Sequence, residues 1–367
     1  MSSEIGPATV TRLRASAYSV PTDLPESDGT LKWNKTTLVL VEIEGGGKHG
    51  LGFTYADRAT AVMVNDLLAN IVNGRNLMHL SECWLAMVRA IRNLGRPGVS
   101  SMAIAAVDVA LWDLKAKLLD LSLSALLGSV REGVPVYGSG GFTSYSVEKL
   151  CDQLAGWVAQ GIRAVKMKIG TQPEQDLHRV AAARAAIGPD AELFVDANGA
   201  YARKQALRFS RLFAEQDVRW FEEPVSSDDL AGLHLLRKRA PASMEIAAGE
   251  YGYDLHYFRR MLEAEAVDVL QADVTRCAGI TGLMQVGALC WSRSMPLSAH
   301  CAPSIHAHVG CALLPLRNLE YFHDHARIEH MLFDGVLTPC GGELIPDRER
   351  LGLGLEFKHK DAAPYAL

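Results

Sequence analysis

The sequence lacks the marks of membrane, secreted and nucleic-acid-binding proteins. No run approaches 18 uninterrupted apolar residues, so we expect no transmembrane helix and no membrane partner. Residues 1–4 do not begin a basic segment followed by an apolar one, so we expect no signal peptide. The formal net charge of −5 gives no reason to expect nucleic acid or an anionic membrane surface as a partner.

Cysteine pairs and phosphate loops are also missing. The seven cysteines are odd in number and scattered, with no Cys-x-x-Cys, which argues against a disulfide framework or a zinc site. This pattern favours reduced thiols in a cytoplasmic protein. The glycines at 45–47 and 50 lack the Lys-Ser/Thr pair and the strand-to-helix setting of a phosphate loop. We therefore interpret them as a hairpin turn.

What is present is typical of a soluble globular protein. Hydrophobic residues make up 49% and charged residues 22% of the 367 residues. This length suits a barrel of about 250 residues plus a smaller domain. Strands near 36–43 and 51–55, followed by helical patterns over 57–70, 79–93 and 100–119, predict an α+β domain at residues 1–125. We interpret Asp108 and Asp113, in the last of these helices, as structural or solvated.

The chain is organised around residues 165–169, which read Val-Lys-Met-Lys-Ile. On a buried strand, Lys166 and Lys168 point to the same face, because side chains two apart share a face. Two ammonium groups in one buried site need anions beside them, unless one lysine loses its proton. A lysine whose pKa is lowered in this way is a usable base. The alternative is an edge strand with two solvated lysines.

After Lys168 the chain repeats one pattern, in which an apolar run ends in an ionisable residue and a helical segment follows. Successive ionisable residues are 20 to 28 positions apart, which suits one strand and one helix each. The run-ending residues are Asp196, Glu222, Glu250, Asp273, His300 and Glu320. Functional groups at the ends of parallel strands predict a (β/α) barrel. We place it at residues 126–335, with residues 336–367 returning to the first domain.

Three of these carboxylates come from successive strand ends and should converge at one rim of the barrel. Asp196, Glu222 and Glu250 would then need a cation to neutralise them, and oxygen ligands of this kind suit magnesium. No Cys or His clusters with them in the sequence, which argues against zinc or copper. The alternative is that each carboxylate caps a helix or pairs with an arginine.

Asp273 and His300 should also be neighbours at the barrel mouth. A carboxylate on one imidazole nitrogen fixes the tautomer and makes the other nitrogen more basic, so His300 could act as an acid or a base. The alternative is a core histidine satisfied by the backbone.

A carboxylate substrate held by the metal would present its α-carbon between Lys168 and His300. Lys166 and a protonated Glu320 could then stabilise the enediolate formed when the α-proton leaves.

The combined motifs resemble the mandelate racemase subgroup of the enolase superfamily over the full length of the chain. The resemblance implies a modified TIM barrel, (β/α)7β, with an N-terminal α+β capping domain. It implies Mg²⁺ on the three carboxylates, Lys168 as a base, an Asp273–His300 dyad, and Glu320 as a donor to the substrate carboxylate. The segments that carry it are Lys166-Met-Lys168, Val195-Asp196-Ala197-Asn198, Phe221-Glu222-Glu223-Pro224, Gly249-Glu250, Asp273, His300 and Leu319-Glu320.

The position of Asp273 narrows the reaction. Muconate-cycloisomerase-like and dipeptide-epimerase-like relatives carry a lysine at the end of this strand, so the sequence disfavours both activities. The resemblance favours dehydration of a sugar acid to a 2-keto-3-deoxy acid by a cytoplasmic homo-oligomer, from dimer to octamer. A racemase or epimerase of a 2-hydroxy acid shares the first step and remains an alternative. A non-catalytic barrel that serves as a binding protein is the alternative from another class.

Specificity should come from the side of the substrate that lies away from the metal. We expect residues 19–34, a polar stretch with Pro21 and Pro25, to form a long loop that acts as a lid over the barrel mouth. We expect the substrate to contact four residues: Asn198, Lys166, Glu320 and Trp33.

Overall fold

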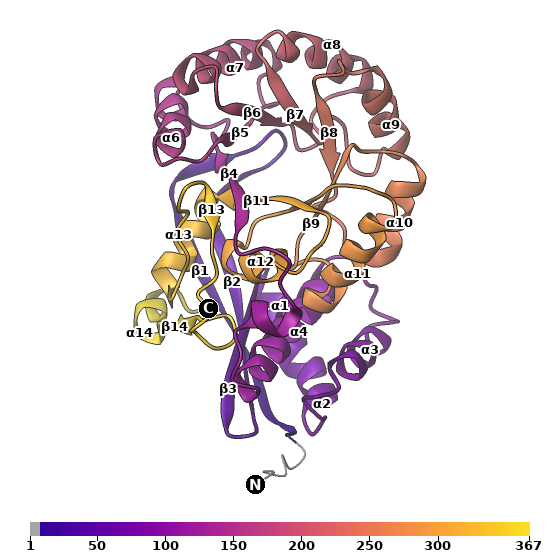
Figure 1. The fold of residues 1–367 in the computed structure, drawn as a ribbon, viewed down its shortest axis with the longest axis vertical. Helices are drawn as coiled ribbons and strands as arrows, with labels where there is room; N and C mark the ends of the chain where they lie inside the picture. The colour runs from indigo at the N-terminus through magenta and orange to yellow at the C-terminus, as the bar shows by residue number, and fades with distance from the viewer. Residues whose placement is uncertain (1–7) are drawn as a thin grey trace.

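The strand that carries the two lysines is the second of eight parallel strands that close into a barrel (Figure 1). The computed structural model describes residues 8–367. The eight strands are β4 (Val134–Gly140), β5 (Ala164–Lys168), β6 (Glu192–Asp196), β7 (Val218–Glu222), β8 (Glu245–Ala248), β9 (Val269–Ala272), β10 (Leu297–Ala299) and β11 (Leu316–Phe322). Pairing of β11 with β4 closes the barrel, so no strand edge is left open there.

Helices connect the strands on the outside of the barrel, as the predicted alternation of apolar runs and helical segments requires. They are α6 (Val147–Ala159), α7 (Pro173–Ile187), α8 (Arg203–Ala214), α9 (Leu230–Arg239), α10 (Leu255–Glu263), α11 (Gly279–Trp291), α12 (Pro303–Gly310) and, after the last strand, α13 (His323–Leu332). Their starts carry ordinary signals. Ser146, Asp229 and Asp254 each accept a backbone N–H as N-caps, and Pro173 is the first residue of α7.

Large side chains fill the barrel interior beneath the strand ends. Phe194 and Trp220 stack with ring centroids 5.0 Å apart, and Tyr137 meets the edge of Phe194. These rings form one fully buried cluster with Ala247 and Val269. The packed interior leaves the carboxyl ends of the strands as the place where polar side chains can meet a ligand.

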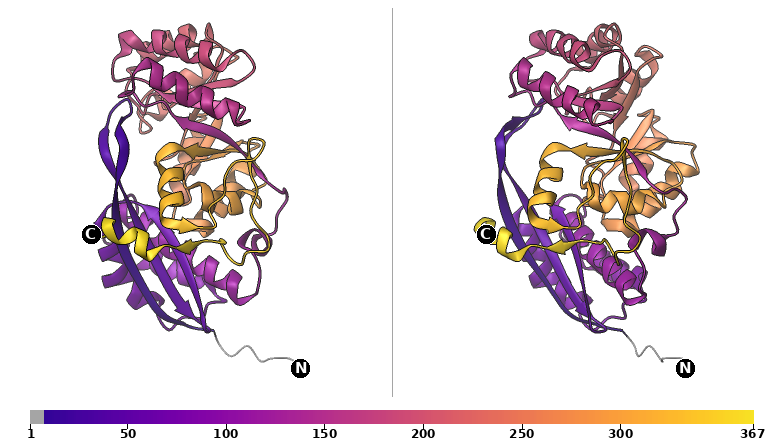
Figure 2. Two further views of the ribbon diagram at one scale, coloured as in Figure 1. Left: turned by 90° about the vertical axis from the view of Figure 1, so that its left-hand side faces the viewer. Right: turned by 60° about the vertical axis from the view of Figure 1, so that its left-hand side comes forward.

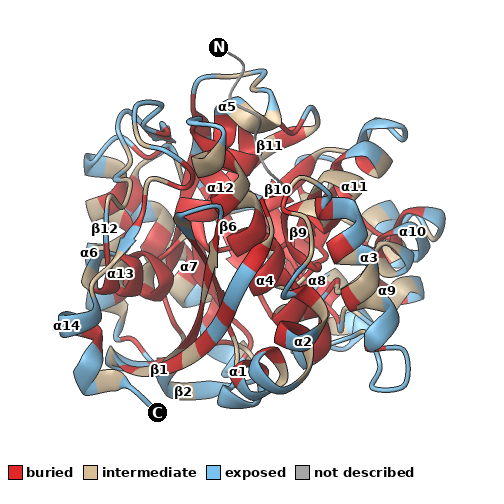
Figure 3. Ribbon diagram, turned by 90° about the horizontal axis from the view of Figure 1, so that it is seen from below, coloured by how far each residue is buried: buried red, intermediate tan, exposed pale blue. Residues whose placement is uncertain are grey.

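An antiparallel sheet and several helices cap the barrel, as predicted. The sheet has the order β1 (Val10–Ser27), β2 (Lys32–Gly45), β3 (Lys48–Tyr55). The helical elements are α1 (Arg58–Met63), the π-helical turn η1 (Val64–Leu68), α2 (Ala69–Val72), α3 (Leu80–Ala90), α4 (Val99–Leu118) and α5 (Leu123–Leu127). Helix α4 is buried over most of its length, because it packs between the sheet and α11 of the barrel (Figure 3).

The prediction of a loop over residues 19–34 is wrong, because this segment is the end of the β1–β2 hairpin. Pairing runs from Ser27↔Lys32 down the hairpin, with one irregularity between Pro21 and Glu26. The prolines are tolerated because β1 is an edge strand and needs no donor on its open side. In both views of Figure 2 the hairpin runs from the cap along the barrel to the level of α6.

The C-terminal segment runs back from the barrel to the cap. Its elements are β12 (Phe333–Asp334), β13 (Glu343–Leu344), β14 (Glu356–Phe357), α14 (His359–Ala362) and the 3₁₀ turn η2 (Ala363–Tyr365). Strand β13 pairs with β4, Gly352 forms a bridge with Ser122, and Ala366 forms one with Tyr18. Among residues 8–367, no helix is long and apolar enough to cross a membrane. The prediction on residues 1–4 lies outside the described residues.

Candidate active site

The ionisable residues predicted at the strand ends all meet at the mouth of the barrel. Lys168, Asp196 and Glu222 are the last residues of β5, β6 and β7. Three other members follow the next three strands and one lies within β11, and each residue is at most 5% exposed; they are Glu250, Asp273, His300 and Glu320. The shared phase that predicted a common rim therefore brings these groups into one buried cluster.

Lys166 is the centre of the ion pairs on one side of this cluster. Its Nζ lies 2.6 Å from Glu222 Oε1, 2.8 Å from Glu320 Oε1 and 3.5 Å from Asp196 Oδ2. Burial by itself would lower the pKa of Lys166, but the carboxylates of Glu222 and Glu320 outweigh it and hold the pKa well above its usual value. Trp220 Nε1 donates to the other oxygen of Glu222 at 2.9 Å and fixes that carboxylate.

Lys168 lies beside Asp196, to which its ammonium group donates a hydrogen bond. Burial would lower the pKa of Lys168, yet Asp196 raises it above its ordinary value. Of the two outcomes predicted for this lysine pair, the structure shows anions beside both ammonium groups and not the loss of a proton by one lysine. Burial and the neighbouring Asp196 raise the pKa of Glu222 to about 8. Asp196 and Glu222 therefore compete for the ammonium groups of the two lysines.

The predicted dyad is formed on the opposite side of the mouth. His300 Nδ1 lies 2.9 Å from Asp273 Oδ2, while the backbone N–H and the hydroxyl of Thr275 each donate to Asp273 Oδ1 at 2.7 Å. Burial would raise the pKa of Asp273, but the hydrogen bond and charge of His300 hold it below its usual value. Asp273 therefore stays ionised, and the Nδ1–H bond leaves His300 Nε2 facing the cavity.

Glu320 connects the two sides of the site. Its Oε1 accepts a hydrogen bond from Ser139 at 2.6 Å, and its Oε2 lies 3.4 Å from His300 Nε2. Burial would raise the pKa of Glu320, but Lys166 and His300 lower it. Glu320 is thus an acceptor here, and its predicted role as a donor to a substrate carboxylate stays a prediction.

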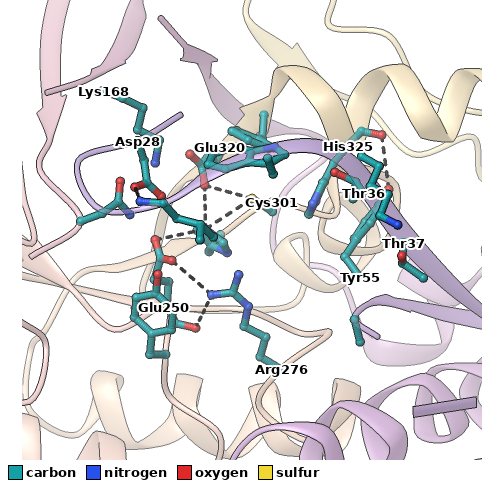
Figure 4. A pocket seen from close by; sticks show the side chains of 18 residues that line it. Asp28, Thr36, Thr37, Tyr55, Lys168, Glu250, Arg276, Cys301, Glu320 and His325 are labelled. Atoms are coloured by element: carbon teal, nitrogen blue, oxygen red, sulfur yellow. Dashed lines mark hydrogen bonds and ion pairs between the residues drawn. The ribbon is translucent and has the colours of Figure 1, made fainter. Parts of the chain in front are cut away.

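These groups open into a cavity of about 320 Å³ between the barrel mouth and the end of the β1–β2 hairpin (Figure 4). Trp33 and Asn198, both predicted to contact substrate, line it, while Lys166 lies beneath it. Trp33 packs edge-on against Phe142, with centroids 5.6 Å apart. Asn198 Oδ1 is buried and has no hydrogen-bond partner among the described residues, so it is free to bind a ligand.

The hairpin tip lies directly on the barrel loops. Asp28 accepts from the backbone N–H groups of Thr30 and Leu31 and lines the cavity. A Cβ at Gly29 would collide with the backbone carbonyl oxygens of Ala197 and Ile169. Only glycine allows this close approach. The segment predicted to cover the mouth therefore covers it, although as a hairpin.

Three carboxylates of the cluster have the donor set for a hard divalent cation. Asp196, Glu222 and Glu250 each offer an oxygen atom, and these atoms lie within 4.8 Å of one another. All three are buried, and a bound divalent cation would neutralise their negative charges. Oxygen-only ligands of this kind suit magnesium. The neighbouring Glu223 Oε1 is also buried and has no hydrogen-bond partner among the described residues.

Sequence reasoning missed two residues that contact this cluster. Arg276 Nη1 lies 3.2 Å from Glu250 Oε1, and its Nε lies 3.6 Å from Asp273 Oδ2, so it joins the carboxylate group to the dyad. Cys301 places its sulfur 3.4 Å from His300 Nε2. Both lie within three residues of a predicted site residue, which was the only signal available. The alternative that the carboxylates pair with arginine holds for Glu250 alone among the three.

Comparison with known proteins matches two family models to this chain. The model described as mandelate racemase/muconate lactonizing enzyme, N-terminal domain, matches residues 14–128. The model described as enolase C-terminal domain-like matches residues 149–362. Together they cover most of the cap, the barrel from α6 onward except for its first two residues, and most of the returning segment.

Three relatives illustrate the similarity. A 3,6-anhydro-alpha-L-galactonate cycloisomerase from Streptomyces coelicolor is 32% identical over 357 residues, covering 95% of this chain and 98% of the relative. A mandelate racemase/muconate lactonizing enzyme-like protein from Rubrobacter xylanophilus has a crystal structure with a TM-score of 0.96 and 55% identity, covering 98% and 100%. The L-talarate/galactarate dehydratase from Salmonella typhimurium LT2, liganded with Mg and L-lyxarohydroxamate, superimposes with a TM-score of 0.89 and 26% identity, covering 100% and 95%.

Proposed function

The chain belongs to the mandelate racemase/muconate lactonizing enzyme family of the enolase superfamily, and we propose that it is a magnesium-dependent acid-sugar dehydratase. It removes the proton α to a carboxylate and expels a β-hydroxyl, which gives a 2-keto-3-deoxy acid. Relatives named as a galactarate dehydratase and an anhydrogalactonate cycloisomerase support acid sugars as the substrate class. The seven free cysteines support a cytoplasmic location.

The observation that carries this proposal is the pair of proton-transfer groups on opposite sides of three buried carboxylates. Lys168 lies on the β5 side, and the Asp273–His300 dyad lies on the β10 side. A substrate held between them presents an α-carbon to one group and a leaving hydroxyl to the other. A non-catalytic barrel would have no need of an oriented imidazole and two buried lysines at one cavity.

The metal-binding role falls to Asp196, Glu222 and Glu250, whose oxygen atoms already face one another. When bound, magnesium supplies a Lewis acid that neutralises the substrate carboxylate. The family resemblance and a magnesium-bound relative support this cofactor. Each of the three carboxylates is buried, so substitution of any one should weaken metal binding.

Within the site, Lys168 accepts the α-proton after its ammonium group has released to solvent the proton that it donates to Asp196, and the electron pair of the broken C–H bond moves into the carboxylate. Lys166 lies beside the place where this enediolate charge develops, and its positive charge lowers the energy of the enediolate. Glu320 donates a hydrogen bond there only when it is protonated. His300 then donates its Nε2 proton to the β-hydroxyl, which leaves as water when the electron pair returns. The enol product rearranges to the 2-keto acid, so the net change is the loss of one water.

Selection among acid sugars should depend on the hairpin side of the cavity. Trp33 offers an apolar face there, while Asp28, Asn198 and Lys35 offer polar groups to hydroxyls or to a second carboxylate. We further propose a homo-oligomer, from dimer to octamer, which light scattering on the purified protein would test. Neither the contacts on the hairpin side nor the number of subunits alters the proposed proton transfers beside the metal-binding carboxylates.

The test is a panel of aldonic and aldaric acids incubated with the Mg²⁺-loaded protein in deuterated water. Dehydration predicts a 2-keto product that has lost one water and has gained one deuterium at C3, where the enol takes up a proton from the solvent. An unchanged mass with one deuterium at the α-carbon would instead indicate a racemase or epimerase, and an isomer with a new ring would indicate a cycloisomerase. Lack of both turnover and magnesium binding would overturn the proposal in favour of a binding protein.

A further inference from the structure

A second set of possible metal ligands lies at the barrel mouth beside the three carboxylates, with His300 Nε2 3.3 Å from Glu250 Oε2. His300 Nε2 lies 3.4 Å from Cys301 Sγ and 3.4 Å from Glu320 Oε2, and Cys301 Sγ lies 3.4 Å from the same Glu320 oxygen. The three atoms therefore form an almost equilateral triangle of nitrogen, sulfur and oxygen. All three side chains are buried, and all three line the cavity (Figure 4).

The spacing of this triangle fits tetrahedral zinc. Zinc bonds of about 2.0 to 2.3 Å to nitrogen, oxygen and sulfur place neighbouring tetrahedral ligands about 3.3 to 3.7 Å apart. A thiolate and an imidazole also select borderline and soft ions over magnesium, which prefers oxygen ligands alone. The fourth position would face the cavity, where water or a substrate oxygen can fill it.

The side chains of His300 and Glu320 are each oriented by a second partner, and the backbone of Cys301 is held in place. Asp273 holds His300 Nδ1 at 2.9 Å, which leaves Nε2 as the ligating nitrogen, and Ser139 holds the other oxygen of Glu320 at 2.6 Å. Cys301 adopts a φ of +54°, an unusual value for a residue with a side chain, and its carbonyl accepts a hydrogen bond from His306 at 2.7 Å. Outer partners of this kind are what fix metal ligands in proteins.

We propose that His300, Cys301 and Glu320 form a thiophilic divalent-cation site whose occupation by Zn²⁺ inhibits the enzyme. Binding releases the thiol proton and any Nε2 proton to solvent, so His300 can no longer exchange a proton with substrate. The inhibitory consequence rests on the proposed function, whereas the binding site does not. The sequence hid this site because a single cysteine after His300 matches no spaced zinc motif.

Cobalt(II) absorption tests binding without reference to activity. Cobalt added to Mg²⁺-saturated protein should give a thiolate charge-transfer band and the visible bands of a tetrahedral site. Cys301→Ser should lose the charge-transfer band, and Cys340→Ser, which alters an exposed cysteine, should keep it. On the unaltered protein, Zn²⁺ but not Mg²⁺ should protect Cys301 from alkylation, as measured by peptide mass spectrometry. This second measurement needs no variant and so is independent of folding.

Inhibition is measured separately on whichever substrate the protein turns over. Zn²⁺ should inhibit the wild type at saturating Mg²⁺, and Cys301→Ser should need at least about tenfold more Zn²⁺ for the same fractional loss of its own rate. A cobalt band that persists in Cys301→Ser would overturn the site. Inhibition that excess Mg²⁺ relieves would overturn it too, because the zinc would then occupy the three carboxylates. Dehydration without a cobalt band leaves the proposed function standing and removes only this site.

Discussion

His300 shows how much a single residue depends on its neighbours. Its Nδ1 lies on Asp273, while its Nε2 lies within 3.4 Å of Glu250, Glu320 and Cys301. Burial would lower the pKa of His300, but Cys301, Glu250 and Glu320 together raise it well above its usual value. The imidazole is therefore charged in this state, which suits a residue that must donate a proton to a leaving hydroxyl.

Lys168→Ala and His300→Asn should each lower turnover by about 10²-fold or more, because each removes one proton-transfer group. The losses should differ for exchange of the substrate α-proton with solvent deuterium. Lys168→Ala should abolish exchange, whereas His300→Asn should retain part of it, since His300 acts only after the proton has left. Lys204→Ala, on an exposed face of α8, serves as the control and should be silent. Near-normal turnover in Lys168→Ala would contradict the assignment of the base.

At the scale of elements, the β1–β2 hairpin is where the structure differs from the loop predicted from the sequence. Strands and helices of the barrel could be predicted because each carries its own signal, such as the cap Ser146 or the proline that begins α7. The hairpin end carries Pro21, Pro25 and Gly29, which usually mark a loop. Its pairing depends on the partner strand and on the barrel surface beneath, and neither is visible in a local window of sequence.

Gly29→Leu should displace the hairpin tip, because the Cβ would collide with backbone carbonyls of the barrel loops. We expect kcat/KM to fall by at least about tenfold as the cavity opens to water, while magnesium binding persists. Isothermal titration with Mg²⁺ and steady-state kinetics separate the two effects. Gly156→Ala, at a helical position with open space around it, is the matched control. Unchanged kinetics in Gly29→Leu would show that the hairpin plays no part in turnover.

Glu26 should make the stability of the protein fall as pH rises from about 5 to about 8. The residue is 1% exposed, and burial, followed by the charge of Asp324, raises its pKa to about 8; Asp23 raises it further, whereas Trp33 and Arg327 lower it. A carboxyl with a raised folded pKa binds more protons in the folded state. Its contribution to stability is complete below its unfolded pKa and is lost as pH rises through about 8.

Glu26→Gln keeps an uncharged acceptor for the indole N–H of Trp33 and removes the titration. The melting temperature of the wild type should therefore fall more steeply between about pH 5 and pH 8 than that of Glu26→Gln. Thermal unfolding followed by circular dichroism across this range gives both slopes. Parallel slopes would mean that Glu26 does not titrate in the folded protein over this interval.

At the scale of the whole molecule, buried polar contacts join the cap to the barrel. Asp108 of α4 accepts from the backbone N–H and the hydroxyl of Thr281, at 2.8 and 2.7 Å, at the start of α11. Asp113 of the same helix accepts from the backbone N–H groups of Leu51 and Leu353, both at a buried site. The sequence interpretation of these residues as structural is confirmed, while a solvated position is wrong, since both are fully buried.

Asp108→Ala should destabilise the protein by about 1 to 3 kcal/mol, because it leaves the half-buried backbone N–H and hydroxyl of Thr281 without their acceptor. Chemical denaturation with the same slope as the wild type would identify the loss as one of stability alone. If cap and barrel form one cooperative unit, the variant should still unfold in a single transition at lower denaturant. A new, early transition confined to part of the signal would instead show that the cap unfolds by itself.

Because the three carboxylates come from three different strands, magnesium bound to them should stabilise the closed barrel as a whole. An ion at about 100 times its Kd adds about 2.7 kcal/mol to the free energy of unfolding, provided that the unfolded chain does not bind it. We therefore expect the entire unfolding transition of the wild type to move upward with added Mg²⁺. Glu222→Gln removes one charged ligand and should lose most of this shift. Glu192→Gln, at the exposed start of β6, should keep it. A shift of equal size in Glu222→Gln would place the ion elsewhere in the molecule.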